Sequence, residues 1–206
     1  IAAALYCSHE QREALISQGI RQDDWVSYEN MFVRKNGEIF TGRLAFHSLK
    51  NAEGEVFGIE GYVVDISEQK RAEKMLRESE EKYRLLVENA TDGIVVAQDG
   101  VLKFSNPKAG EITGYSSAEM EFRPFIEMIH PEDRKMVFNC HLKRLRGGEV
   151  PECYQFRIVS REGEVRWVEI HAVLISWTGA LASLNFISDI TARKQAEEML
   201  IKALNE

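Results

Sequence analysis

Apolar and polar residues alternate most clearly in the stretch from 165 to 174, which reads VRWVEIHAVL. Successive side chains of a β-strand point to opposite faces of the sheet, so residues two apart share a face. The apolar residues here follow that spacing, at Val168, Ile170, Ala172 and Leu174. The uncharged run that continues to 188 is interrupted by a WTG turn and therefore predicts a hairpin rather than a membrane-spanning helix.

The same pattern occurs twice along the chain. Residues 32–46 read FVRKNGEIFTGRLAF and match IVSREGEVRWVEIHA at 158–172, which is 126 positions later (158 − 32). A second matching pair is DISEQKRAEKML at 65–76 and DITARKQAEEML at 189–200, which are 124 positions apart (189 − 65). Each copy predicts a strand, a tight turn, a long strand, a second turn, a third strand and a helix. The difference of two residues is expected in the second turn, because loops tolerate changes in length.

Only the second copy has further elements in front of it. Residues 83–150 contain two short apolar strands, DGIVVAQ and VLKFS, joined by a DG turn, and then short helices between 107 and 146. The first copy has room in front for little more than a helix over 2–18. The chain is therefore expected to hold one complete unit and the C-terminal half of a similar one.

A helix is expected to join the two units. Its apolar and small residues recur at spacings of four and three, as in a coiled coil, and the positions between them are rich in Glu, Lys and Arg. The pattern predicts self-association along a seam, although a solvated connector helix would also be rich in charge. The seam residues are Ala72, Leu76, Tyr83 and Leu86.

The charge of the chain argues against nucleic acid as a partner. The net charge is −7, and the one basic cluster, HLKRLRGG at 141–148, is interpreted as a solvated helix end. The three cysteines, Cys7, Cys140 and Cys153, are odd in number and lack CxxC spacing, so a reducing compartment is favoured over a disulfide framework. Neither a signal peptide nor a membrane span is recognised, and a cytoplasmic location is predicted.

The motifs of the second unit, taken in order, resemble the PAS (sensory-box) family. They are ENATDGIVVAQDGVLKFSNPKAGEITGYSSAEM, IHPEDR, REGEVRWVEI and SDIT, and the first unit carries RKNGEIF and GIEGYVVDIS. The resemblance implies an α+β fold, in which a five-stranded antiparallel sheet in the order 2-1-5-4-3 is covered on one face by helices. Between sheet and helices this family has either a small-molecule pocket or an ordinary core.

The resemblance also implies the domain organisation. Residues 1–66 correspond to the C-terminal half of a first PAS domain, 67–90 to a helical linker, 83–191 to a complete second PAS domain and 192–206 to the start of an output helix. Such tandem segments sense a cue and relay it to an effector domain of the same protein, for example a histidine kinase. The incomplete first domain suggests that the natural protein extends beyond this sequence. The alternative is a ligand-free module that serves only for dimerisation or scaffolding.

Pocket positions follow from strand parity and from alignment with the family pattern. The last strand contributes Asn185, whose counterpart in the first copy is Gly61. A buried Asn needs hydrogen-bond partners, which a polar ligand, a water molecule or the backbone can supply. The full set of candidate ligand-binding residues is Asn185, Ser183, Ile187, Val168, Ile170, Ala172, Phe156, Ile94 and Val96.

Two repeated positions are candidates for signal relay. In the PAS family, an aspartate and a hydroxyl residue at the end of the last strand anchor the exit helix to the sheet. The matching residues are Asp65 with Ser67 in the first copy and Asp189 with Thr191 in the second. Both hydroxyl residues also stand where a helix N-cap is expected.

Cofactor chemistry finds little support in the sequence. The flavin-reactive cysteine of light-sensing members is absent from EFRPFIEMIHPED at 121–133, and the context expected around a haem-binding His141 or His130 is missing. His130 and Asp133 are too few for a metal site, and the HPED stretch is interpreted as a helix start at Pro131. No cofactor is therefore predicted, and a small-molecule ligand remains open.

Catalytic motifs are also absent from the sequence. The stretch CSHEQREAL at 7–15 resembles the phospho-accepting helix of histidine kinases, but Gln11 replaces a leucine and the continuation differs. His9 is therefore not predicted to be phosphorylated, and the segment is expected to be regulatory, with any kinase domains lying elsewhere.

Overall fold

The computed structural model describes residues 24–204, and its backbone contacts divide the chain between 81 and 82 into two units. Residues up to 81 are called unit 1, and residues from 82 onwards are called unit 2. The helix predicted over 2–18, together with Cys7 and His9, lies outside the described residues.

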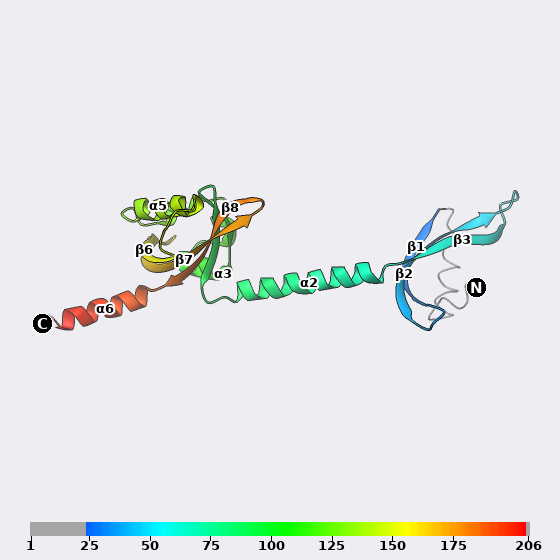
Figure 1. The fold of residues 1–206 in the computed structure, drawn as a ribbon, viewed down its shortest axis with the longest axis horizontal. Coiled ribbons are helices and arrows are strands. Elements are labelled where there is room, and N and C mark those ends of the chain that lie inside the picture. The colour runs from blue at the N-terminus through cyan, green and yellow to red at the C-terminus, as the bar shows by residue number, and fades with distance from the viewer. Residues whose placement is uncertain (1–23, 205–206) are drawn as a thin grey trace. The chain divides into compact units, whose positions relative to one another are not determined.

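Unit 1 contains an antiparallel three-stranded sheet in the order β1-β2-β3 (Figure 1). The turn between the first two strands uses Gly37 at a φ of 88°, in the left-handed region that favours glycine. Aromatic residues dominate its small core, where Phe32 and Phe46 are almost fully buried beside Leu44. The strands are β1 (Val26–Val33), β2 (Ile39–Lys50) and β3 (Val56–Asp65).

The core of unit 1 depends on a glycine in β3. Phe46 of β2 lies opposite Gly61, and a Cβ atom placed on Gly61 would lie 2.5 Å from the Cβ atom of Phe46 and 2.5 Å from the carbonyl oxygen of Ala45. In unit 2 the same cross-strand pair is Ala172 and Asn185. Unit 1 thus has a large residue opposite glycine, whereas unit 2 has a small residue opposite asparagine.

The helix between the two sheets, α2 (Ser67–Glu88), has Ser67 as its first residue, and the Ser67 hydroxyl accepts from Thr41 of β2 instead of serving as the predicted N-cap. None of its residues is buried, and pairs such as Arg77 with Glu81 connect successive turns along its surface. Neither α2 nor any other helix within residues 24–204 is both long and apolar enough to cross a bilayer.

Unit 2 has a five-stranded antiparallel sheet in the order β5-β4-β8-β7-β6. Numbered within the unit, this order is 2-1-5-4-3, so the predicted α+β fold is confirmed. Its elements are β4 (Gly93–Gln98), β5 (Val101–Ser105), α3 (Pro107–Thr113), α4 (Ser117–Met120), the 3₁₀ helix η2 (Phe125–Met128), α5 (Arg134–Leu145), β6 (Cys153–Val159), β7 (Val165–Trp177), β8 (Ala180–Asp189) and α6 (Thr191–Leu204).

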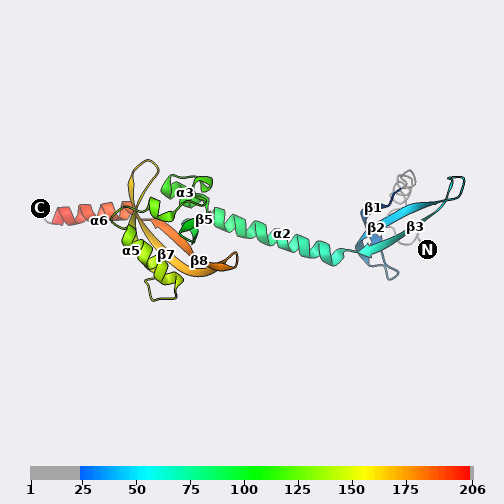
Figure 2. The same cartoon turned by 90° about the horizontal axis from the view of Figure 1, so that it is seen from above.

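The alternation in β7 buries three of the four residues of the predicted face, and the fourth, Leu174, is exposed. Val168, Ile170 and Ala172 are each less than one tenth exposed and pack in one core with residues of α3, η2 and α5. Helix α5 lies against the central strand β8, and β8 leads directly into α6 (Figures 1 and 2). One face of the sheet therefore carries the helices, and one end of its central strand carries the exit helix.

The start of α5 differs from the prediction at Pro131. The helix begins at Arg134, and residues 131–133 form a turn in front of it. The carboxylate of Asp133 does not cap the helix; both of its oxygens accept hydrogen bonds from Arg157 of β6. The carboxylate of Asp133 therefore joins the start of α5 to the edge strand β6 instead of capping the helix.

The close approach at Gly61 yields the first prediction. Gly61→Ala should lower the free energy of unfolding of unit 1 by about 1 to 3 kcal/mol, because the added methyl group overpacks the site. Gly58→Ala in the same strand is the control: the nearest atom to its new Cβ is Leu49 Cδ1, at 3.7 Å. Amide hydrogen exchange in β2 and β3 measures both effects. Equal effects of the two substitutions would contradict the packing argument.

Candidate functional site

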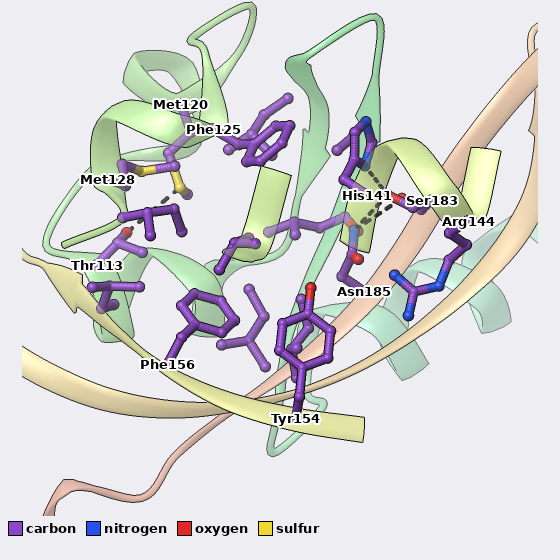
Figure 3. A pocket seen from close by; sticks show the side chains of 18 residues that line it. Thr113, Met120, Phe125, Met128, His141, Arg144, Tyr154, Phe156, Ser183 and Asn185 are labelled. Atoms are coloured by element: carbon purple, nitrogen blue, oxygen red, sulfur yellow. Dashed lines mark hydrogen bonds between the residues drawn. The ribbon is translucent and has the colours of Figure 1, made fainter. Parts of the chain in front are cut away.

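Unit 2 encloses a cavity of about 70 Å³ between the inner face of its sheet and the helices above it (Figure 3). Its walls are mainly apolar, with Met120 and Phe125 on the helical side and Phe156 on the sheet. No Asp or Glu lines the cavity, and its polar lining residues are Thr113, His141, Arg144, Tyr154, Ser183 and Asn185.

Five of the candidate pocket residues line this cavity: Asn185, Ser183, Ile187, Ile170 and Phe156. Two others from the same prediction, Val168 and Ala172, belong to the surrounding core but do not line it.

The prediction for β4 was wrong by one residue. Val95 lies opposite Asn185 and Ala97 lies opposite Ser183 in the pairing of β4 with β8. Directly opposed residues share a face, so Val95 and Ala97 line the cavity, whereas Ile94 and Val96 lie on the other face. The sequence DGIVVAQ is apolar at consecutive positions, and only the pairing with β8 determines which of them face inward.

Asn185 is the best-connected polar group of the cavity. Its side-chain nitrogen donates to the carbonyl oxygens of Ser183 at 2.9 Å and Val95 at 3.3 Å, and to the Ser183 hydroxyl oxygen at 3.2 Å. Three acceptors within the protein therefore hold the amide of Asn185 in one orientation.

His141 continues this polar chain. Its Nδ1 atom lies 3.3 Å from the Ser183 hydroxyl oxygen. Because the Asn185 nitrogen can only donate, Ser183 accepts from it and has its own proton available for Nδ1. The ring proton of the neutral imidazole then lies on Nε2, which is buried and has no hydrogen-bond partner among the described residues. The site therefore contains one unsatisfied donor.

The environment of His141 keeps its imidazole neutral. Burial lowers the pKa of His141, and the positive charge of Arg144 on the next turn of α5 lowers it further. The interpretation of residues 141–148 as a solvated helix end was wrong for His141, because the residue is only 6% exposed and faces β8. His130 does not line the cavity; its Nδ1 atom accepts a hydrogen bond from the backbone of Glu132 at 3.4 Å.

Arg144 was missed by the sequence analysis. The basic cluster was interpreted as solvated, yet Arg144 is only 7% exposed and lines the cavity. Its Nη2 atom donates to the carbonyl oxygen of Pro151 at 2.8 Å. The signal was the spacing of Val137, His141 and Arg144, which at four and three residues forms one face of a helix. The basic charge of the cluster favoured a solvated helix end and outweighed this spacing.

Helix α5 is held in place at its start. Asp133 accepts from the backbone nitrogen of Arg157 at 2.8 Å and from its guanidinium group at 2.8 and 3.0 Å. The hydrogen bonds from Arg157 lower the pKa of Asp133, and those to Asp133 and then Glu132 raise the pKa of Arg157. Because α5 carries His141 and Arg144, this ion pair helps to position both over the cavity.

The cavity does not fit the larger cofactors of the family. Sites for drug-sized ligands occupy about 300 Å³ or more, so a haem or a flavin exceeds the cavity volume of about 70 Å³. Neither Cys140 nor Cys153 lines the cavity, and no cluster of three or more metal-binding side chains occurs within residues 24–204.

The two predicted relay junctions share one geometry. The backbone nitrogen of Ser67 donates to Asp65 at 2.9 Å, and that of Thr191 donates to Asp189 at 2.8 Å. The hydroxyl oxygen of Ser67 accepts from the backbone of Thr41 at 2.9 Å, and that of Thr191 accepts from the backbone of Trp167 at 3.0 Å. Each hydroxyl residue thus joins the first turn of a helix to the neighbouring long strand.

The junctions differ in their ionic contacts. Arg34, the residue after β1, forms an ion pair with Asp65, whose pKa is lowered first by hydrogen bonds from Ser67 and then by Arg34. The position equivalent to Arg34 in the second copy is Ser160 (34 + 126), and Asp189 has no ion pair within residues 24–204. The junction to α2 is therefore ionically reinforced, and the junction to α6 depends on hydrogen bonds.

A five-stranded antiparallel sheet in the order 2-1-5-4-3, with a cavity under its helices and an exit helix on its central strand, defines a sensory α+β domain. Residues 102–185 match a family model described as the PAS fold, and residues 3–68 match one described as a PAS domain. The chain belongs to the PAS family. It carries two PAS segments, which are regulatory domains with a role in sensory signalling.

Similar proteins include signalling kinases. Sporulation kinase A of Bacillus subtilis is 27% identical over 160 residues, which cover 75% of this chain and 25% of that protein. A blue-light-activated histidine kinase of Brucella ovis is 25% identical over 195 residues, which cover 88% of this chain and 39% of that protein. The chain thus spans well under half of these relatives. A solved PAS domain of an HTR-like protein from Haloarcula marismortui is 28% identical, covers 59% of this chain and 99% of its own, and has a TM-score of 0.48.

Burial of His141 yields a prediction on pH. Because the folded state holds the pKa of His141 below its unfolded value of about 6.5, the unfolded state binds the proton more readily. Stability is therefore lost as the pH falls below about 6.5, with a slope of at most about 1.4 kcal/mol per pH unit for this group. His141→Asn should flatten that slope in urea titrations of unit 2 between pH 7.5 and 5.5.

The exposed His171 provides the control for this measurement. His171→Asn should leave the slope unchanged. If both variants retain the wild-type slope, protonation of His141 does not limit the stability of unit 2.

Proposed function

We propose that residues 83–191 form a sensory domain whose cavity binds a small molecule and whose occupancy is relayed along β8 to the output helix that begins at Thr191. Residues 1–66 form the corresponding half of a preceding PAS domain, and the helix over 67–90 connects the two. The whole segment controls an effector domain of the same protein.

The path of β8 is the observation that carries this proposal. Ser183, Asn185 and Ile187 occupy every second position and line the cavity, and Asp189 follows at the next step. At about 3.3 Å per residue, Asn185 lies roughly 13 Å along the strand from the aspartate that holds α6. A ligand that binds more tightly to one of two arrangements of β8 would shift the equilibrium between them toward that arrangement. The docking of α6 would change with it, to an extent set by the difference between the two affinities.

The effector is proposed to be a histidine kinase. The two curated relatives bear kinase names, and this chain matches 25% and 39% of their lengths. Asp189 at the end of β8 accepts from the backbone nitrogen of Thr191 at the start of α6, so a change at the sheet would reach the output helix.

A specific observation favours a second candidate function, that of a dimerisation module. Helix α2 exposes large apolar side chains and buries none. Leu76, Tyr83 and Leu86 of the predicted seam are each more than 60% exposed. Packing these residues against a second copy would remove them from water, which gives the seam a driving force for self-association. The two functions are compatible, because a dimer of linker helices can transmit a change in either sheet.

The relay is tested by removing one aspartate at a time. Asp189→Ala removes the acceptor for the Thr191 backbone nitrogen, and loss of such a cap costs about 1 kcal/mol. Hydrogen exchange of the first turn of α6 should therefore accelerate about fivefold, while the amides of β4 and β8 around the cavity keep their protection. Asp65→Ala is the matched variant and should affect α2 but not α6. If hydrogen exchange of the sheet amides accelerates as much as that of the helix amides, Asp189 stabilises the whole domain rather than the junction alone.

The seam is tested by introducing charge. Leu76→Lys should convert a dimer to a monomer in analytical ultracentrifugation, because a lysine at a seam position brings like charges together across the interface. Glu78→Lys introduces the same side chain two residues away, outside the seam, and should leave the dimer intact. A wild-type chain that sediments as a monomer at all concentrations would refute dimerisation through α2.

A further inference from the structure

The geometry points to a short-chain organic carboxylate as the ligand class of the cavity in unit 2, with Arg144 as its charge partner. This inference rests on the proposed function, because it names the chemistry of the molecule that the sensory domain would bind. It depends on the charge, the hydrogen-bonding capacity and the size of the cavity.

The cavity carries an unbalanced positive charge at Arg144. Arg144 is only 7% exposed, and no carboxylate pairs with it anywhere in the described chain. No residue that lines the cavity carries a negative charge. Buried charges in proteins are normally paired, since an unpaired cation loses its hydration without compensation. The cavity therefore presents one positive charge that the protein itself does not neutralise.

The guanidinium group of Arg144 has spare hydrogen-bonding capacity. A guanidinium group carries five N–H donors, and that of Arg144 interacts with the carbonyl oxygen of Pro151 and with the Tyr154 hydroxyl group, which leaves further donors available. Figure 3 shows the guanidinium group directed toward Tyr154 and Asn185 at the edge of the cavity. A planar guanidinium group with free donors matches the two oxygens of a carboxylate. The hydroxyl group of Tyr154 adds another donor on the same side.

His141 adds an unsatisfied donor to the same side of the cavity. Its Nε2–H group has no acceptor among the described residues, and His141 lies one helical turn before Arg144 on the same face of α5. Both residues line the cavity. An acceptor-rich group is the chemistry that such a face lacks, whereas an ammonium or amidinium ligand would add a second unpaired positive charge.

The size of the cavity limits the remainder of the ligand. A volume of about 70 Å³ holds roughly five to seven water-sized groups, if each takes about 10 to 15 Å³. The walls opposite the polar face are apolar, with Met120, Phe125 and Phe156 among them. A carboxylate group followed by a short alkyl chain meets both conditions. Butyrate, with six non-hydrogen atoms, is the natural probe.

Unit 1 lacks this arrangement at the equivalent position. Phe46 lies over Gly61, where unit 2 has Ala172 and Asn185. The inference is therefore confined to unit 2.

The experiment compares charged and neutral probes on the full chain. Binding of butyrate at pH 7 is followed by chemical-shift changes of the Ser183 and Asn185 amides, and butyramide serves as a neutral probe of equal size. Butyrate should saturate and should bind at least about tenfold more tightly than butyramide, as expected for charge-assisted hydrogen bonds. Chloride and inorganic phosphate at matched ionic strength should produce neither shift nor competition.

Three variants assign the effect to Arg144. Arg144→Gln should weaken butyrate binding about tenfold or more and remove the preference over butyramide. Arg144→Lys retains the positive charge and should keep part of the preference for butyrate. If it does, the loss of binding in Arg144→Gln comes from the missing charge and not from misfolding. Arg146→Gln removes an exposed charge from the end of the same helix and should leave the affinity unchanged.

The outcomes separate this inference from the proposed function. If butyramide and butyrate bind equally, or if chloride or phosphate competes as well as butyrate, the carboxylate inference is overturned while a ligand-binding cavity remains. If no probe of either charge shifts the cavity amides, both the inference and the proposed sensory role of the cavity fail.

Discussion

The pairing of β8 between β4 and β7 is the interaction on which the rest of unit 2 depends. Asn185 lies opposite Val95 on one side and Ala172 on the other, so the last strand of the unit joins residues about 90 positions apart. This pairing builds the five-stranded sheet from its first and last strands and determines which side chains of β4 face the cavity. It also ends at Asp189, so the strand that forms the cavity floor is the strand that holds the exit helix.

The two PAS segments keep the junction and differ in the cavity. Ser67 and Thr191 make equivalent contacts with the backbone of the neighbouring strand, which preserves the mechanical connection between sheet and helix. The cross-strand pair four residues before the aspartate is Phe46 with Gly61 in unit 1 and Ala172 with Asn185 in unit 2. Unit 1 therefore has its large side chain on the middle strand of the pair, and unit 2 has it on the last strand. The two units therefore share the contacts of the junction and differ in the cross-strand pair that precedes it.

Strand parity was predictable where apolar and polar residues alternate, and not where they do not. In β7 the sequence alternates, and Val168, Ile170 and Ala172 are buried as expected. In β4 consecutive residues are apolar, so burial of Val95 and Ala97 toward the helices depends on the register with β8. For α5 the difficulty was charge: His141 and Arg144 belong to a basic cluster that is typical of a solvated helix end, yet their spacing turns them toward the sheet.

The sequence by itself determined the repeat, the order of the elements, the family and the paired junctions at Asp65 and Asp189, because these follow from local periodicity and from residues close together along the chain. Only the tertiary structure decided which face of β4 lines the cavity, that Arg144 is buried without a carboxylate, and that Asp133 pairs with Arg157 instead of capping its helix. The physical reason is that burial and ion pairing depend on strands and helices far apart in sequence, and local patterns carry no information about which of these come together.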